Sequence, residues 1–180
     1  MTAPIAHVTF IIISLHPRTK GSFTVQKNHP TPTTDIHYMR LALELAREAA
    51  ADGEVPVGAL IVQKGEIIAA ARNRREKGKS ALLHAELEAI GIACEKLGGW
   101  RLPDCTLYVT LEPCPMCAGA IVNSRIPRIV FGAGDPRAGA FGSMLDLRNY
   151  PLGHKPEITR GILQEECAAL LRDFFKSRRK

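Results

Sequence analysis

The stretch Leu111-Glu112-Pro113-Cys114-Pro115-Met116-Cys117-Ala118-Gly119 determines how the rest of the chain is interpreted. It lies where a strand-like run (residues 106–110) gives way to a helix-like run (residues 118–124). Two cysteines separated by two residues are typical of a redox dithiol, of half a structural zinc knuckle, or of part of a catalytic metal site. Residues elsewhere in the chain have to discriminate among these three possibilities.

A second short motif, His84-Ala85-Glu86, favours the catalytic metal site. A catalytic zinc has three protein ligands and leaves a fourth position for water. We therefore predict one zinc ion per subunit bound by His84, Cys114 and Cys117, with Glu86 as the catalytic residue that moves protons. A structural knuckle would need a second ligand pair, and a redox dithiol would leave the His-Ala-Glu motif without a role. The remaining cysteines stand singly in apolar contexts: Cys94, Cys105 and Cys167.

The positions of these residues fit that chemistry. Hydrophobic periodicity predicts a helix over about residues 83–97, so that His84 and Glu86 lie in its first turn. Deep inside a helix, residues two apart point to nearly opposite sides, but at a helix start the entering chain can turn both toward one point. Cys114 and Cys117 stand near the start of the next predicted helix, where backbone N–H groups favour the thiolate.

The composition is that of one compact domain: 180 residues, with an ordinary apolar content and a net charge of +6. Five cysteines, an odd number, argue against a disulfide framework and favour a reducing, cytoplasmic location. No apolar run approaches the ~20 residues that cross a bilayer, so we expect no membrane partner. Positive charge is concentrated at residues 72–79 and 176–180, and on charge alone both segments would be interpreted as solvated.

The order of patterns along the chain predicts the domain organisation. Four prolines and no amphipathic period suggest a disordered extension at residues 1–34, followed by one compact domain at residues 35–180 that contains the predicted zinc site. In that domain helical and strand-like runs alternate, with a hairpin turning at Lys64-Gly65 and a glycine-rich loop at residues 132–142. This alternation predicts an α/β three-layer sandwich. The last predicted helix, residues 164–176, has an apolar stripe that we expect to be buried: Cys167, Leu170, Leu171, Phe174 and Phe175.

The motifs His84-Ala85-Glu86 and Pro113-Cys114-Pro115-Met116-Cys117 resemble those of the zinc-dependent nucleobase deaminases. The resemblance covers residues 35–180, leaves residues 1–34 without a counterpart, and is greatest to the bacterial tRNA adenosine deaminases. The stretches that carry it are Glu54-Val55-Pro56-Val57-Gly58-Ala59, Asn73-Arg74-Arg75-Glu76, residues 107–114, 116–121 and 124–126, Phe131-Gly132-Ala133, residues 166–171 and Phe174-Phe175.

The resemblance implies a cytidine deaminase-like α/β/α sandwich with a five-stranded mixed sheet, assembled as a homodimer. It implies hydrolytic deamination of adenosine to inosine at the wobble position (34) in the anticodon stem-loop of a tRNA, chiefly an arginine tRNA. It also implies that Asn73, Val57 and Ala85 bind the extruded base and that Asp135 contacts the anticodon backbone. Without the resemblance, these four would be interpreted as a turn Asn, two core residues and a turn Asp.

Two other functions stay open at this point. A free-base deaminase acting on guanine or cytosine would share the fold but would have little use for the basic loop and tail. A non-catalytic, zinc-stabilised RNA-binding module would need the metal ligands but not Glu86. The chain departs from the bacterial family at Gly78-Lys79-Ser80 and at Leu82-Leu83, where a larger side chain beside the zinc ligand could narrow the pocket.

Overall fold

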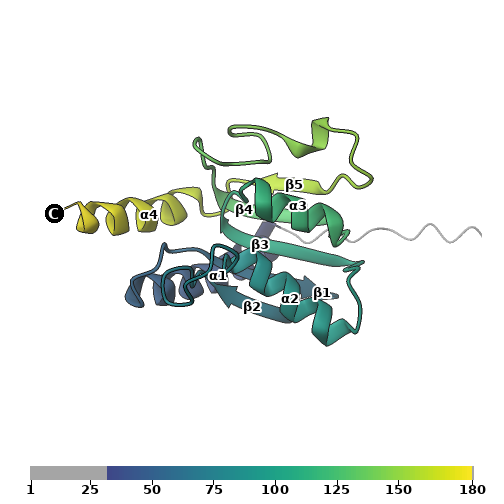
Figure 1. Cartoon of the computed structure of the whole chain (residues 1–180), viewed down its shortest axis with the longest axis horizontal. Coiled ribbons are helices and arrows are strands. Elements are labelled where there is room, and N and C mark those ends of the chain that lie inside the picture. The colour runs from purple at the N-terminus through teal and green to yellow at the C-terminus, as the bar shows by residue number, and fades with distance from the viewer. Residues whose placement is uncertain (1–31, 180) are drawn as a thin grey trace, which may run out of the picture.

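The computed structural model describes residues 32–179, which form one five-stranded mixed sheet with helices on both faces (Figure 1). The strand order is β2-β1-β3-β4-β5; β1 pairs antiparallel with β2 and β3, whereas β3-β4 and β4-β5 are parallel. The expected three-layer sandwich is confirmed. The strands are β1 (Gly58–Gln63), β2 (Glu66–Arg72), β3 (Cys105–Leu111), β4 (Arg128–Ala133) and β5 (Glu157–Arg160). The helices are α1 (Pro32–Ala51), α2 (Ala85–Leu97), α3 (Pro115–Asn123), α4 (Gln164–Arg178) and the short 3-10 helix η1 (Leu147–Asn149).

Two hydrophobic clusters, one on each face of the sheet, hold the three layers together. On one face lie α2 and α3, and the side chains that α2 buries are mostly small, which lets the helix approach the sheet closely. On the other face, α1 packs Met39 and Leu43 against Tyr108 of β3, and the first turn of α4 adds Cys167. A backbone contact also fixes α1, because a Cβ at Gly58 would lie only 2.1 Å from the Ala42 carbonyl oxygen.

The predicted hairpin is confirmed, and its turn residues Lys64 and Gly65 both have positive φ (51° and 85°), as a two-residue hairpin turn requires. Two helices begin earlier than expected: α3 starts at Pro115, before the helix-like run at residues 118–124, and α1 starts at Pro32, before the expected domain start at residue 35. In both cases a proline occupies the first position, where its missing N–H costs nothing. The predicted extension, residues 1–34, lies almost entirely outside the described residues.

The prediction that α4 buries a long apolar stripe is wrong beyond the first turn. Only Cys167 is buried, while Leu170, Leu171, Phe174 and Phe175 are half-exposed. Figure 1 shows the reason: the yellow helix α4 leaves the sheet and projects past its edge, so that no strand lies under its second half. Leu170 still packs against the core, whereas Leu171 and Phe175 form part of one wall of an open groove.

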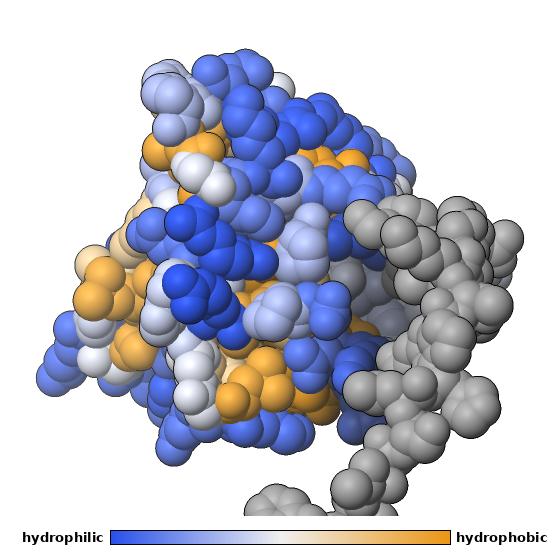
Figure 2. Space-filling model, turned by 90° about the vertical axis from the view of Figure 1, so that its right-hand side faces the viewer, coloured by the Kyte–Doolittle hydropathy of each residue, from blue (hydrophilic) through white to orange (hydrophobic). Residues whose placement is uncertain are grey.

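The surface on the side opposite the projecting helix is mainly hydrophilic, with small separate hydrophobic patches (Figure 2). Within residues 32–179, no helix is both long enough and apolar enough to cross a membrane.

Candidate active site

Three potential metal ligands from two distant parts of the sequence meet at one point. The Nδ1 atom of His84 lies 3.8 Å from the Cys114 sulfur and 3.5 Å from the Cys117 sulfur, and all three ligand atoms lie within 4.8 Å of one another. Typical Zn–N and Zn–S bond lengths in a tetrahedral site place a nitrogen and a sulfur about 3.6 Å apart. The donor set and its spacing therefore fit a zinc ion.

Two helix starts bring these ligands together. His84 is the N-cap residue of α2 and Cys114 is that of α3, each with extended backbone angles, and neither side chain caps its own helix. β3 delivers the chain directly to Cys114, and Pro115 sets the first helical turn that carries Cys117. His84 thus precedes the helix rather than lying in its first turn, which lets its ring turn toward the sulfurs.

The two thiols differ in acidity because they interact with each other. Hydrogen bonds from Cys117 and His84 lower the pKa of Cys114 to about 4, although burial opposes this. The same bond and burial raise the pKa of Cys117 above its ordinary value. The bond to Cys114 raises the pKa of His84. Binding a metal ion here would release a proton, since zinc takes thiolate and neutral imidazole as ligands.

Glu86 is the buried carboxyl group of this cluster, only 4% exposed in the first turn of α2. Its charge acts on His84 and on Cys117, so the expected convergence of the His-Ala-Glu motif on the metal cluster is present in the structure. Burial raises the pKa of Glu86. A carboxyl group in such surroundings holds a proton near neutral pH more readily than an exposed one, as proton transfer requires.

The predicted base-binding residues lie around a second buried carboxylate, Glu54, which is 1% exposed. Its Oε2 atom accepts a hydrogen bond of 3.3 Å from the Asn73 side-chain amide. Val57 accepts a backbone bond from Asn73, so the two are neighbours, and Ala85 is completely buried beside His84. The segment with Asn73 is joined to the residue before His84 by a backbone bond of 3.0 Å from the Arg74 N–H to the Leu83 carbonyl oxygen. The roles of Asn73, Val57 and Ala85 toward a substrate stay predictions.

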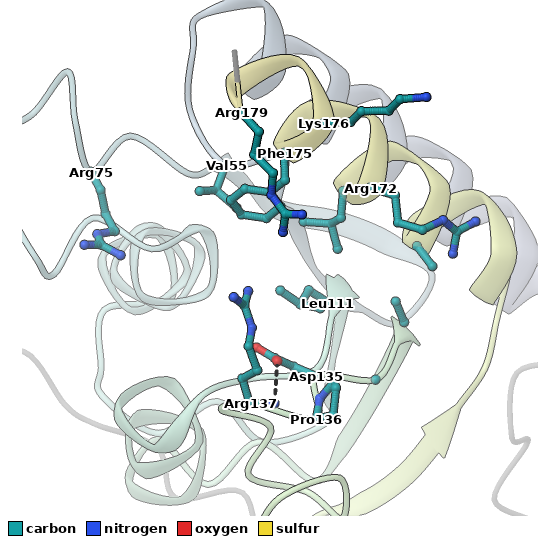
Figure 3. A pocket seen from close by; sticks show the side chains of 14 residues that line it. Val55, Arg75, Leu111, Asp135, Pro136, Arg137, Arg172, Phe175, Lys176 and Arg179 are labelled. Atoms are coloured by element: carbon teal, nitrogen blue, oxygen red, sulfur yellow. Dashed lines mark hydrogen bonds between the residues drawn. The ribbon is translucent and has the colours of Figure 1, made fainter.

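Asp135 lies in the glycine-rich loop, half-buried, where its side chain accepts a bond of 2.9 Å from the Arg137 N–H. This loop and α4 form opposite walls of a groove of about 900 Å³ (Figure 3). Arg75 lies at the left of this view, apart from the two walls, and Arg137 points up from the loop toward α4. The groove is lined by Leu111, three residues before Cys114, while none of the cluster residues His84, Glu86, Cys114 and Cys117 is part of its lining. The α4 wall contributes Leu171, Arg172, Phe175, Lys176 and Arg179.

The charged residues of the groove differ from those that the sequence emphasised. In the basic loop, Arg72 pairs with Glu48 and Asp52, and Arg74 pairs with Glu88, so part of its charge is neutralised. Arg137 and Arg172 were missed, although they line the groove. A signal for Arg172 existed, because Arg172, Lys176 and Arg179 recur at helical spacing on one face of α4. For Arg137, which follows Asp135-Pro136, the charge distribution along the sequence did not indicate that the residue lines the groove.

The two leucines before the zinc ligand do not obstruct the site. Leu82 is 62% exposed and points to solvent. Leu83 packs over Gly78, where a Cβ would lie 2.0 Å from a Leu83 methyl group. The two departures from the bacterial family are therefore one packing arrangement, in which a glycine makes room for the larger side chain.

Comparison with known proteins agrees with this geometry. A family model described as MafB19-like deaminase matches residues 33–179. The tRNA-specific adenosine deaminase of Bacillus subtilis (strain 168) is 49% identical over 149 residues, which cover 82% of this chain and 92% of that protein.

Solved structures extend the comparison. A structure from studies of A-to-I editing by tRNA:A34 deaminases at the wobble position aligns with a TM-score of 0.73 and 45% identity, covering 75% of this chain and 99% of the other. A guanine deaminase from Nitrosomonas europaea aligns with a TM-score of 0.63 and 29% identity, over 89% of this chain and 96% of the other. The chain belongs to the MafB19-like deaminases, in the group that includes the tRNA-specific adenosine deaminases.

Proposed function

We propose that this protein is a cytoplasmic, zinc-dependent tRNA adenosine deaminase that converts adenosine to inosine at wobble position 34, chiefly in an arginine tRNA. The observation that carries the proposal is the position of a buried carboxyl group, Glu86, beside a zinc-type ligand set. A groove with cationic walls lies at the same, carboxyl end of β3 and β4. The similarity to tRNA-specific adenosine deaminases supports adenosine as the substrate.

The chemistry divides between a metal ion and the chain. Bound by His84, Cys114 and Cys117, zinc would supply Lewis-acid activation of a water molecule. Glu86 accepts a proton from that water and passes it to the ring nitrogen of the base. It then moves a second proton to the departing amino group, which leaves as ammonia. The raised pKa of Glu86 suits it to hold the proton between these transfers.

The groove suits a single-stranded RNA loop. RNA loops are bound by extruding bases into pockets while cationic side chains hold the phosphates. Arg75, Arg137 and Arg172 lie around the groove, and the Phe175 ring lines it between the α4 cations. The Arg137 guanidinium lies over the Phe175 ring, 5.9 Å from its centroid, so an aromatic surface for stacking lies beside positive charge. Asp135 and Asn73 then contact the anticodon backbone and the extruded base, respectively.

We also propose that the enzyme is a homodimer. A shallow depression between the outer sides of α2 and α3 is lined by Ile90, Cys94, Trp100 and Ala120, and the Trp100 side chain is 54% exposed. Large exposed apolar groups are typical of subunit interfaces. Light scattering of the purified protein tests this, and a mass of 19.7 kDa at micromolar concentration would contradict it.

The test of activity uses an anticodon hairpin with adenosine at position 34, incubated with the zinc-loaded protein and digested for nucleoside analysis. Inosine is the expected product. A matched hairpin with guanosine at position 34, and free guanine, serve as controls, because the similarity to a guanine deaminase makes guanine the rival substrate. Turnover of guanine without inosine formation would refute the proposal, and absence of both would favour a binding module.

A further inference from the structure

Glu112, the residue two before the ligand Cys114, is a buried carboxylate for which the mechanism above has no use. It is 2% exposed, and among residues 32–179 it forms no salt bridge with a cation. An unpaired buried carboxylate is costly unless hydrogen bonds satisfy its oxygens. Its partners therefore indicate what the residue stabilises.

All of those partners belong to residues 135–143, the segment made of most of the glycine-rich loop and the residue that follows it. Oε1 accepts hydrogen bonds from the backbone N–H groups of Phe141 (2.9 Å) and Ser143 (3.1 Å). Oε2 accepts bonds from the backbone N–H of Asp135 (3.2 Å) and from the Ser143 hydroxyl. One carboxylate thus holds both ends of the loop segment 135–143.

The loop is built to enclose this carboxylate. A Cβ at Gly139 would lie 2.5 Å from both the Glu112 carboxyl carbon and Oε2, so a glycine is required there for lack of space. A Cβ at Gly134 would lie 2.9 Å from the Ser143 hydroxyl oxygen that bonds to Glu112. These contacts explain why the loop is rich in glycine without positive φ angles at these two positions.

The same bonds connect the loop to the metal-ligand segment. Glu112 is followed by Pro113, whose carbonyl oxygen accepts a bond of 2.9 Å from the Ala140 N–H, and then by Cys114. The loop in turn carries Asp135 and Arg137 into the groove. The position of the loop relative to Cys114 is therefore fixed by the hydrogen bonds of Glu112 and Pro113, which directly precede Cys114 in the chain.

We propose that Glu112 is a positioning residue, which holds the 135–143 loop in register with the metal cluster so that a bound RNA loop presents its base at the correct depth. The inference rests on the proposed function for the RNA, while the loop-fixing role stands on the hydrogen bonds alone. Glu112 acts through the loop and does not touch the base. Misplacement of a substrate-positioning element by about 1 Å can cost on the order of 10²-fold in rate.

The test compares Glu112→Gln with wild type and with Glu66→Gln, an exposed glutamate on β2 at the far edge of the sheet. Glutamine keeps the shape but turns one acceptor into a donor that faces N–H groups. Three measurements are made on the zinc-loaded full chain: zinc content, amide hydrogen exchange of residues 135–143, and KM and kcat on the adenosine-34 hairpin. Ser143→Ala, which removes the hydroxyl bond to Oε2 and leaves the three backbone bonds to Glu112 in place, replaces Glu112→Gln if that variant does not fold.

For Glu112→Gln we expect faster amide exchange in residues 135–143, a KM raised by roughly tenfold or more, and unchanged zinc content. For Ser143→Ala we expect the same changes in exchange and KM, but smaller ones. Unchanged loop exchange overturns the loop-fixing role. Faster exchange with an unchanged KM and kcat overturns the positioning role, and so does loss of zinc in proportion to loss of rate. If wild type makes no inosine, the proposed function fails, and the exchange measurement still decides whether Glu112 fixes the loop.

Discussion

The two ends of the parallel strands β3 and β4 stabilise buried carboxylates in opposite ways. Toward the amino end, Asp35 of α1 accepts hydrogen bonds of 2.9 and 2.7 Å from the Arg128 guanidinium and one of 2.8 Å from the Tyr108 hydroxyl. At the carboxyl end, Glu112 and Glu54 accept from N–H and hydroxyl groups, and neither forms a salt bridge within residues 32–179. One end uses cations for its carboxylate, and the other uses backbone amides.

The difference follows from what each end does. The Asp35–Arg128 pair connects α1 to two strands, so its effect is to fix the layers. Amide-bonded carboxylates fix the shape of loops instead, and they leave the arginines of the carboxyl end to line the groove, where a polyanion is expected to bind. Ligands of parallel sheets bind at the carboxyl ends of the strands, and the groove of this protein lies at that end of β3 and β4. Substitutions at the carboxyl end of the strands should therefore change activity, whereas substitutions at the amino end should change the stability of the fold.

The largest effect is expected from Glu86→Gln at the carboxyl end. Loss of the proton-transfer group should lower kcat on the adenosine-34 hairpin by roughly 10²- to 10⁴-fold, with zinc content and melting temperature unchanged. Glu88→Gln is the matched control, since Glu88 lies on the same helix turn and pairs with Arg74 outside the cluster. A Glu86→Gln protein that retains most of its rate would show that another group moves the protons.

At the amino end, Arg128→Met should destabilise the fold by about 3–5 kcal/mol, because it leaves Asp35 charged and without its partner in a buried site. Urea unfolding measures this loss. The double variant Asp35→Leu/Arg128→Met should regain much of it, since removing both charges leaves none unpaired. The fraction of molecules that stays folded should keep the wild-type KM. A single variant as stable as wild type, or one whose KM rises, would contradict the division between the two ends.

Sequence patterns predicted most of the helices and strands, because these elements depend on local rules of periodicity and turn formation. Alternating runs, the Lys64-Gly65 turn and the spacing of the motifs were sufficient for the order of elements. β5 was missed, since it is short and its residues, Glu157–Arg160, show no alternation of burial. The second half of α4 was assigned to the core because its stripe is apolar, and no local pattern shows that the sheet ends before the helix does.

For the site, the sequence singled out the three residues that cluster in the structure, His84, Cys114 and Cys117, together with Glu86, but gave no role to Glu54 or Glu112. Both stand inside stretches that resemble the tRNA deaminases, yet a single acidic residue at the start of a turn (Glu54) or just before a proline (Glu112) looks like an ordinary surface acid. Their importance depends on burial, which comes from loops 20 or more residues away folding over them: Glu54 bonds to Lys77 across 23 positions and Glu112 to Phe141 across 29. Such contacts are not encoded in a local pattern.

A moderate effect is expected from Glu54→Ala. The substitution leaves the backbone N–H groups of Glu76 and Lys77 without their acceptor and releases the Asn73 side chain. Each lost hydrogen bond to a charged group costs about 1.5–3 kcal/mol of stability. Because the Asn73 side chain also loses the bond that orients it, we expect kcat/KM to fall by about tenfold. Glu44→Ala, on the exposed side of α1, is the control. If kcat/KM is unchanged while stability falls, Glu54 serves the fold and Asn73 does not need it.

The smallest effect concerns alkaline pH and two buried thiols, one near each end of the strands. Burial raises the pKa of Cys105 to about 11 and that of Cys167 to about 12, from an ordinary value of 9.0. A raised pKa means that the folded state keeps the proton which the unfolded state loses, so the stabilisation is complete below pH 9. It should then fall by about 1.4 kcal/mol per pH unit for each thiol until the folded pKa is reached.

Urea unfolding under reducing conditions at pH 8 and pH 10 measures this slope. Cys105→Ala and Cys167→Ala should each reduce the fall in unfolding free energy with pH by about 1.4 kcal/mol per pH unit, the contribution of one thiol. This reduction is separate from any loss of stability that the substitution causes at pH 8. Cys167 packs against the backbone at Gly132, where a Cβ would lie 2.3 Å from the sulfur, so its replacement leaves a cavity at the carboxyl end. If the groove is positioned by the amide-bonded carboxylates rather than by core packing, KM should stay at the wild-type value in Cys167→Ala. An increase in KM would mean that the packing beneath α4 also sets the groove, and that the two ends are less separate than their carboxylates indicate.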